Sequence, residues 1–390
     1  MSNAALNGMR IAVVAPPFLP VPPTDYGGTE LILFELTRGL VEAGAEVTLF
    51  ASGDSRPAPG VRLRALFPQA TSFEAPIDRF LEGASIAQPD RTAHRGPKTD
   101  SWCELEHVHW AMSEIARGTF DLAHTHTPAA LPFGRDLALP MVHTIHHARD
   151  EALTQFYARH ASQRLRFVAI SARQAELVPE IDCNIVHHGL RADTYPLGED
   201  RGYALFLGRL SRCKGPHVAV EAARAAGFEI RVAGEFHAVE SDADYERLLC
   251  ARLSRPGVFV LGPVGGEHKL ESLAGARALL FPITWEEPFG LAAVEAMLCG
   301  TPVIAFARGS APEIIDEGVT GFFARDATEM ARTLSHLDGF DRARCRARAR
   351  ARFSTETMVE RYAEIYGELT GAEAVPVVRS RLNDGLTAGR

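Results

Sequence analysis

Short apolar runs alternate with stretches of helical periodicity along most of the chain. The first run, Arg10 to Ala15, ends in prolines and leads through a glycine pair into a helical pattern over Leu31 to Ala43. Strand, loop and helix in this order are typical of the opening of a doubly wound parallel sheet. The same alternation predicts strands at 10–15, 46–50, 122–123, 141–145, 167–170, 184–186, 203–207, 230–233, 258–261, 278–281 and 303–306.

The pattern divides at a polar segment, 191–202, and starts afresh at Tyr203. We therefore predict two Rossmann-like α/β domains, 9–197 and 198–370, followed by a tail at 371–390. The stretch 52–99 is rich in Pro, Gly, Ala and Ser with little periodicity, and is interpreted as an insertion in the first domain. Ligands of parallel sheets bind at the carboxyl ends of the strands, which predicts a cleft between the domains.

Composition narrows the class of protein. The chain has 390 residues, 46% apolar and 23% charged, which excludes disordered and collagen-like chains. No apolar run approaches the roughly 20 residues of a membrane-spanning helix, although peripheral membrane contact stays open. The formal charge of −8 includes no basic domain, so nucleic acid is not an expected partner. The six cysteines are scattered, and the first residues lack a basic segment followed by a long apolar one, so we expect a cytoplasmic protein. The sequence does not set its oligomeric state.

The densest candidate site runs from Trp285 through Glu287 to Glu295, between a predicted strand and helix. The loop turns at a proline and a glycine, and the N–H groups of the following helix point back at whatever the loop holds. Glu295 has apolar neighbours, so if buried it needs a hydroxyl or cationic partner, such as a sugar diol. The alternative is that Glu295 faces water and Glu287 caps the helix.

A second candidate site follows the first strand of the second half. Arg209 and Lys214 flank a turn that leads into the helix 216–226. Two cations and a helix N-terminus suit one anion, such as a diphosphate, although two solvated side chains are the alternative. Lys214 is one of only three lysines, which favours the anion site slightly.

Glycines and histidines mark the first half. Gly27-Gly28 before a helix permits close approach of a ligand, or serves only a tight turn. His124, His126, His143, His146 and His147 gather near strand ends, but acidic ligand partners are missing, so a metal site is disfavoured. Asp242-Ala-Asp244 lies far from any predicted strand end and is discounted as a metal–nucleotide motif, and the arginines at 342–352 are interpreted as a solvated helix.

These sites together resemble the family-four retaining glycosyltransferases of the GT-B fold, from Met9 to about Leu369. The most specific likeness is the E-x7-E pattern from Glu287 to Glu295, with Gly208-Arg209 and Lys214-Gly215 next. The resemblance implies that the last helix, 354–369, crosses back to the first domain, which would bind the acceptor while the second binds a nucleotide sugar. It implies these roles: catalytic, Arg209, Lys214, Glu287 and His126; donor-binding, Gly28, Val264, Phe289, Gly290, Leu291 and Glu295; acceptor, Tyr26, Thr29 and His146.

One departure from the family is His187-His188-Gly189, where many members have N-G, and it leaves the hinge and nearby acceptor contacts open. The resemblance implies transfer of a hexose from a nucleotide-diphosphate sugar, UDP-glucose or similar, to a hydroxyl of a small molecule or glycan. Configuration would be retained, with no metal and no cofactor. A sugar-nucleotide epimerase or hydrolase, and a non-catalytic nucleotide-sugar-binding protein, remain alternatives. An NAD dehydrogenase is disfavoured because no G-x-G-x-x-G follows the first strand.

Overall fold

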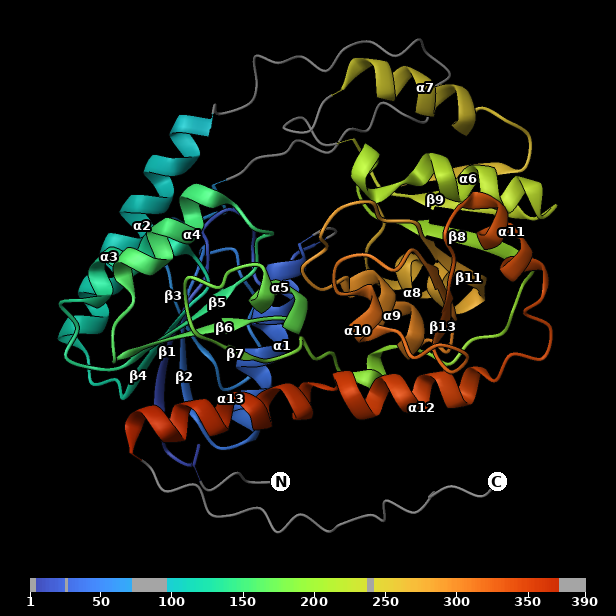
Figure 1. Ribbon diagram of the computed structural model, residues 1–390. Coiled ribbons are helices and arrows are strands. Elements are labelled where there is room, and N and C mark those ends of the chain that lie inside the picture. The colour runs from blue at the N-terminus through green and yellow to red at the C-terminus, as the bar shows by residue number, and fades with distance from the viewer. Residues whose placement is uncertain (1–4, 25–26, 72–96, 237–241, 372–390) are drawn as a thin grey trace.

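The computed structural model describes residues 5–24, 27–71, 97–236 and 242–371. Two parallel sheets lie side by side, each flanked by helices (Figure 1). The first has the order β3-β2-β1-β4-β5-β6-β7, from the strands β1 (Arg10–Val14), β2 (Glu46–Phe50), β3 (Arg62–Arg64), β4 (Leu122–Thr125), β5 (Met141–Ile145), β6 (Leu165–Ala169) and β7 (Cys183–Ile185).

The second sheet has the order β10-β9-β8-β11-β12-β13. Its strands are β8 (Tyr203–Leu207), β9 (Glu229–Ala233), β10 (Val258–Gly262), β11 (Ala276–Phe281), β12 (Val303–Ala305) and β13 (Gly321–Phe323). All the strand pairs are parallel. The prediction of two Rossmann-like α/β domains is therefore confirmed.

Each sheet reverses its strand order at one point. In the first sheet β1 lies between β2 and β4, and in the second β8 lies between β9 and β11. Loops that leave adjacent strands toward opposite faces open a crevice at such a point, where open α/β sheets bind their ligands. The loops after β4, β8 and β11 carry His126, Arg209 and Glu287, so topology places three predicted residues at the two crevices.

The helices cover the faces of both sheets (Figure 1). Those of the first domain are α1 (Gly28–Glu42), α2 (Pro97–Arg117), α3 (Leu131–Gly134), α4 (Glu151–His160) and α5 (Ala172–Glu176). Those of the second are α6 (Pro216–Ala225), α7 (Ala243–Leu253), α8 (Gly266–Gly275), α9 (Leu291–Leu298), α10 (Ala311–Ile314), α11 (Ala327–Ser335) and α12 (Arg342–Phe353). Single 3₁₀ turns occur at Pro128–Ala130, Ala192–Thr194 and Arg212–Lys214.

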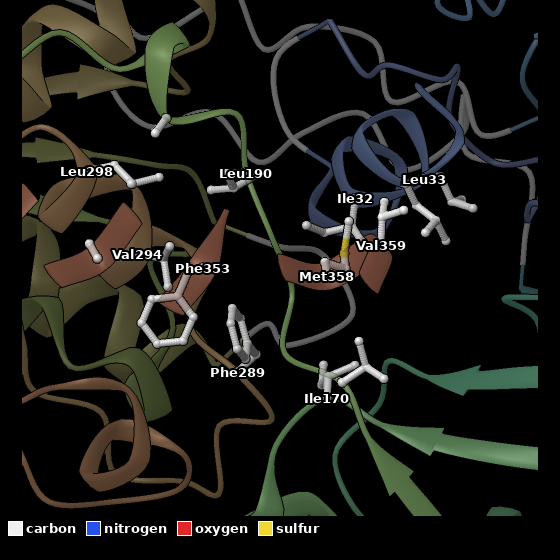
Figure 2. Packing of buried hydrophobic residues seen from close by; sticks show 14 of the residues in the cluster. Ile32, Leu33, Ile170, Leu190, Phe289, Val294, Leu298, Phe353, Met358 and Val359 are labelled. Carbon is white, nitrogen blue, oxygen red and sulfur yellow. The ribbon is translucent and has the colours of Figure 1, made fainter. Parts of the chain in front are cut away.

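The last helix, α13 (Thr355–Thr370), runs beneath the first domain (Figure 1). It packs closely on α1, since a Cβ atom on Gly39 would lie 2.7 Å from a methyl group of Val359. One apolar cluster consequently contains side chains of both domains. Figure 2 shows Phe289 and Phe353 in this cluster together with Ile32 and Leu33 of α1. The domains are thus joined by a shared core as well as by the linker.

The interpretation of α12 as a solvated helix holds for only half of its arginines: three are exposed, and Arg342, Arg346 and Arg352 are half-buried. Arg342 donates hydrogen bonds to the carbonyl oxygens of Gly198, Ala274 and Ala276 at 2.6–2.9 Å. The helix buries a stripe at i, i+4 and i+8, formed by Cys345, Ala349 and Phe353. Arg342 and Arg346 lie beside this stripe and donate to carbonyl groups of the linker, which they hold in place.

The predicted insertion at 52–99 needs a correction at both ends. Strand β3 lies inside it and extends the first sheet at its edge, where Arg64 pairs with Glu114 of α2. Helix α2 begins at Pro97, within the same range. An exposed three-residue edge strand has no apolar pattern to reveal it. Residues 72–96 of this segment lie outside the described part of the chain.

Among the helices of the described ranges, none has the length and apolar character needed to cross a membrane.

Candidate functional site

The loops after β8 and β11 meet in close contact. A Cβ atom on Gly215, which has a φ of 74°, would lie 2.3 Å from the carbonyl oxygen of Pro282. Only glycine therefore fits at Gly215, both for its left-handed backbone and for this approach. The N–H of Thr284 donates to the carbonyl oxygen of Cys213 at 2.8 Å. These contacts bring the basic loop and the acidic loop of the sequence together.

Three of the four predicted catalytic residues gather around Trp285. Lys214 Nζ donates to Glu287 Oε2 at 2.5 Å, and Trp285 Nε1 donates to the same oxygen at 2.7 Å. The ammonium of Lys214 lies 5.0 Å from the centre of the indole ring, and the guanidinium of Arg209 lies 5.8 Å from it. Two cations thus share one aromatic surface beside a largely buried carboxylate, a setting in which charge interacts strongly with an anion.

The second glutamate of the E-x7-E pattern is buried on α9. Glu295 is 4% exposed and accepts hydrogen bonds from Lys269 Nζ at 2.6 Å and from the Tyr195 hydroxyl at 3.1 Å. Burial and the adjacent Glu295 carboxylate raise the pKa of Tyr195 well above its ordinary value, so its hydroxyl stays a donor. The prediction that Glu295, if buried, needs a hydroxyl or cationic partner is confirmed.

The segment Glu286–Leu291, called here the donor loop after the role that the resemblance implies for it, is tightly held. Gly290 has a φ of 90° and precedes the first turn of α9. Opposite the loop, a Cβ on Gly309 would lie 2.3 Å from the backbone nitrogen of Glu287. The hydroxyl of Ser310 donates to the carbonyl oxygen of Phe289 at 2.7 Å. Helix α9 begins four residues after Glu287, and the N–H groups at the start of a helix favour a negative ligand.

Buried histidines of the first domain are hydrogen-bonded, several of them near the strand ends. His124 Nδ1 is 2.6 Å from the Tyr366 hydroxyl, and His124 Nε2 is 2.8 Å from Thr144 Oγ1. His126 Nδ1 is 2.8 Å from His146 Nε2, so one ring donates and the other accepts. His146 stacks on His188, whose ring lies 5.0 Å from Phe289 of the donor loop. His126 and His146 are therefore linked through ring contacts to the second domain.

Burial keeps these rings neutral. It lowers the pKa of His124, His143 and His188 to about 3, and neighbouring histidines oppose protonation further. The same causes lower the pKa of His126 and His146 well below the ordinary value. Neutral imidazoles donate and accept hydrogen bonds without bringing charge, which suits sugar hydroxyls. Within the described ranges, no group of three His, Cys, Asp or Glu side chains is arranged to hold a metal ion.

The remaining predicted residues are spread over both domains. Gly28, the first residue of α1, faces the second domain: a Cβ on it would lie 3.2 Å from Leu291 Cδ1. Thr29 follows it and is half-buried, whereas Tyr26 lies outside the described residues. Val264 occupies the loop between β10 and α8, and the structure does not join it to the Lys214–Glu287 pair.

Asp242 of the discounted motif lies at the start of α7. It caps α7 by accepting from the N–H of Tyr245 at 3.0 Å and pairs with Arg212 in the loop after β8. Asp244 is exposed and pairs with Arg247. Both carboxylates are thus partnered by arginines on the surface, and nothing in the structure contradicts the decision to discount this motif.

Two contributors were missed by sequence reasoning. Lys269 holds Glu295, and the only available signal was the scarcity of lysine in the chain. Glu104 of α2 accepts a hydrogen bond from Thr127, the residue after His126, and burial raises the pKa of its carboxyl. Two surface hollows lie elsewhere, along α12 near Arg344 and beside β7 near His187, and neither is lined by the donor-loop residues.

Comparison with known proteins agrees with this geometry. A family model described as Glycosyltransferase Family 4 matches residues 26–189, and one described as Glycosyl transferases group 1 matches residues 192–350. The D-inositol 3-phosphate glycosyltransferase of Xylanimonas cellulosilytica is 28% identical over 385 residues, which covers 87% of this chain and 91% of that relative. The two family models divide the chain where the two sheets divide.

Solved structures share the fold. Sucrose-phosphate synthase from Thermosynechococcus elongatus has a TM-score of 0.72 at 20% identity, over 94% of this chain and 100% of that one. HepE from Anabaena, in complex with UDP and glucose, has a TM-score of 0.67 at 19% identity, over 92% of this chain and 99% of that one. Both similarities confirm the predicted GT-B architecture. The chain belongs to the group 1 glycosyltransferases and is a glycosyl-transferring enzyme.

Proposed function

We propose that the enzyme transfers a hexosyl group from a UDP-sugar, with UDP-glucose favoured, to a hydroxyl of a small-molecule or glycan acceptor. The observation that carries the proposal is the cluster of Lys214, Arg209 and Glu287 around Trp285 at the crevice of the second sheet. The HepE complex with UDP and glucose supports the choice of donor. The named relatives act on an inositol phosphate, which supports a polyhydroxyl acceptor.

The diphosphate leaving group is stabilised by the second domain. Breaking the bond between the anomeric carbon and the phosphate oxygen develops negative charge on the diphosphate. Arg209, Lys214 and the N-terminus of α9 oppose this charge without reorganising, and so take the role that a metal ion has in other transferases. Glu287 shares Lys214 with the incoming phosphate and accepts hydrogen bonds from the sugar hydroxyls. Glu295, held by Lys269 and Tyr195, accepts from the ribose hydroxyls.

Retention of configuration follows from attack on the face that the leaving group occupies. The acceptor oxygen bonds to the anomeric carbon as the carbon–phosphate oxygen bond breaks, and the acceptor proton passes to the departing phosphate oxygen. His126, neutral through burial, positions the sugar by hydrogen bonding and carries no charge that would oppose the cationic sugar. Glu287 is engaged by Lys214 and Trp285, so it does not act as a nucleophile of the kind found in retaining glycosidases.

An epimerase or a hydrolase of the same fold would release an epimer or free sugar in place of a transferred sugar. A non-catalytic binding protein would bind UDP with no turnover. Analysis of the products formed from UDP-glucose with a panel of polyol and glycan acceptors separates these outcomes. Inclusion of EDTA tests the proposed independence of metal ions.

The placement of the donor is tested by binding. We expect UDP to raise the melting temperature more than GDP or ADP, because a ligand that binds only the folded chain stabilises it by mass action. Lys214→Ala and Glu295→Ala should each weaken UDP affinity about tenfold in calorimetric titration, since each removes a charged contact. Lys214→Arg, which keeps the charge, is the matched control. Unchanged affinity in both alanine variants would refute the site.

A further inference from the structure

Two serine hydroxyls hold neighbouring carbonyl groups of the donor loop, and they come from different domains. Ser171, which follows β6 in the first domain, donates to the carbonyl oxygen of Pro288 at 2.6 Å. Ser310, which precedes α10 in the second domain, donates to the carbonyl oxygen of Phe289 at 2.7 Å. Both serines are fully buried. One serine from each domain thus holds the backbone next to Phe289, at the carbonyl groups of Pro288 and of Phe289 itself.

The first domain holds Ser171 in a rigid corner. Its hydroxyl oxygen accepts from the N–H of Gln174 at 3.0 Å while its hydrogen is directed at Pro288. The side chain of Gln174 accepts from the N–H of Ile170 and donates to the carbonyl oxygens of Ile145 and His147, at 2.8–3.1 Å. Ser171 is therefore positioned by the ends of two strands of the first sheet and has little freedom to follow the donor loop if the domains separate.

Further polar contacts cross between the domains beside Ser171. The carboxylate of Glu313 accepts from the N–H of Ala172 at 2.8–2.9 Å, and His187 Nε2 lies 2.5 Å from it. Although burial opposes ionisation, the hydrogen bonds from His187 and Ala172 hold the pKa of the Glu313 carboxyl below its ordinary value. Arg173 Nε donates to Glu286 of the donor loop at 2.8 Å. We call these contacts, together with the Ser171–Pro288 bond, the interdomain clasp.

The apolar surroundings make this contact sensitive to the distance between the domains. Phe289 packs in the shared cluster, with its ring centre 5.9 Å from that of Phe353 (Figure 2). Figure 2 also shows Ile170, the residue before Ser171, near Phe289. A hydrogen bond this well shielded from water weakens steeply when its donor and acceptor move apart.

We propose that Ser171 is a positioning residue of the first domain that sets the donor loop for transfer only when the two domains meet. Its bond to Pro288 places Glu287 and Phe289, the residues on either side, in their working positions. Ser310 holds the same loop from within the second domain, in open and closed forms alike. Ser171 therefore couples domain closure to the transfer step, whereas Ser310 maintains the donor site itself. The expected change in kcat rests on the proposed function, whereas the structural coupling between the domains does not.

Hydrogen-exchange mass spectrometry of the full chain tests the coupling without any ligand. In Ser171→Ala we expect faster exchange on both sides of the clasp, at 172–176 and at 286–291. In Ser310→Ala we expect faster exchange at 286–291 and 311–315 but not at 172–176. Faster exchange at 172–176 alone in Ser171→Ala would show that the hydroxyl only caps α5, and would overturn the proposal.

Kinetics test the consequence for the reaction. With UDP-glucose as donor, Ser171→Ala should lower kcat about tenfold and leave the Kd for UDP within about twofold, because the lost bond acts on the closed form. Ser310→Ala should weaken UDP binding, and Ser171→Thr, which keeps the hydroxyl, should restore kcat. Equal losses of kcat and UDP affinity in Ser171→Ala would overturn the split between the serines. If the unmodified protein neither binds UDP nor consumes UDP-glucose, the proposed function fails, and the exchange experiment still decides the role of Ser171.

Discussion

The first domain faces the meeting point of the sheets with buried, neutral histidines, whereas the second faces it with two lysine–glutamate pairs. His124, His126 and His146 have hydrogen-bond partners but no charge. Glu287 and Glu295 each have an ammonium partner at 2.5–2.6 Å. Both faces lie at the carboxyl ends of parallel strands, so the fold alone does not explain the difference.

The difference matches the two halves of a glycosyl transfer. A diphosphate carries charge that fixed cations must meet, and a carboxylate beside each cation keeps it in place until the ligand arrives. An acceptor hydroxyl and a developing cationic sugar need hydrogen bonds but no added positive charge, which neutral imidazoles supply. The asymmetry makes the first domain sensitive to acid and the second sensitive to loss of a single charge.

The largest expected effect is acid destabilisation through the first domain. His124, His143 and His188 have folded pKa values of about 3 against an ordinary 6.5, so the unfolded chain binds more protons between these values. Stability is then complete above pH 6.5 and is lost as pH falls toward 3. From pH 7.5 to 5.5 each ring should cost on the order of 1 kcal/mol of the free energy of unfolding, and the three together a few kcal/mol. Urea titrations at the two pH values measure this loss.

Two histidine variants show which rings are responsible. His188→Gln should reduce the pH-dependent loss without abolishing it, because one of several buried rings is gone and the others remain. His336→Gln makes the same change at an exposed ring at the end of α11 and is the matched control. Equal unfolding free energies at pH 7.5 and 5.5 would contradict the neutral state of the first-domain histidines.

The next largest effect is expected for Glu287→Gln, which distinguishes the role of the Glu287 charge in transfer from its role in UDP binding. Glu287→Gln keeps the shape of the side chain and an acceptor for Trp285, but removes the negative charge that holds Lys214. We expect transfer from UDP-glucose to fall about 100-fold, because the sugar loses a charged contact that strengthens as the bond breaks. The Kd for UDP should stay the same or fall, since Lys214 is released to the diphosphate.

The neighbouring Glu286 supplies the control for that variant. Glu286→Gln makes the same change in the same loop, but its side chain is a third exposed and pairs with Arg173 of the interdomain clasp. We expect it to lower the rate by no more than a few-fold, as is usual for partly exposed ion pairs. A Glu287→Gln enzyme that transfers normally but binds UDP poorly would show that Glu287 only shapes the site.

Most of the fold could be predicted from the sequence because the central strands are buried on both faces and form continuous apolar runs. Strands β3 and β13 were missed, since each has three residues and neither is fully buried. Arg342 of α12 was misinterpreted for a related reason: its partners are carbonyl groups of the linker and of β11, more than 60 residues away, and no local pattern contains them.

Residues of the candidate site that lie in short sequence motifs were predicted. Residues whose partners are distant in the sequence were not. Lys214 and Glu287 were found because each lies in a short pattern between a strand and a helix. Lys269 was missed because its bond to Glu295 spans two helices, α8 and α9. Ser171 lies 117 residues from Pro288 and has no motif to mark it. Contacts between domains depend on how the domains dock, which local periodicity does not encode.

The smallest expected effect concerns the contact between Gly28 of the first domain and Leu291 of the second. In Gly28→Ala the new methyl group would lie 3.2 Å from Leu291 Cδ1, a contact tight enough to require a shift of a few tenths of an ångström. A leucine methyl group moves easily, so we expect only about a threefold rise in the KM for UDP-glucose, or roughly 0.6 kcal/mol. Because the contact joins the two domains, the loss of donor affinity falls on the form in which the domains meet.

A double-mutant cycle with Leu291→Ala measures the coupling between the two positions. The effects should be non-additive because the second change removes the opposing methyl group. Additive effects would show that Gly28 and Leu291 are not in contact during transfer, and that the two faces act on the sugar from farther apart than this structure places them.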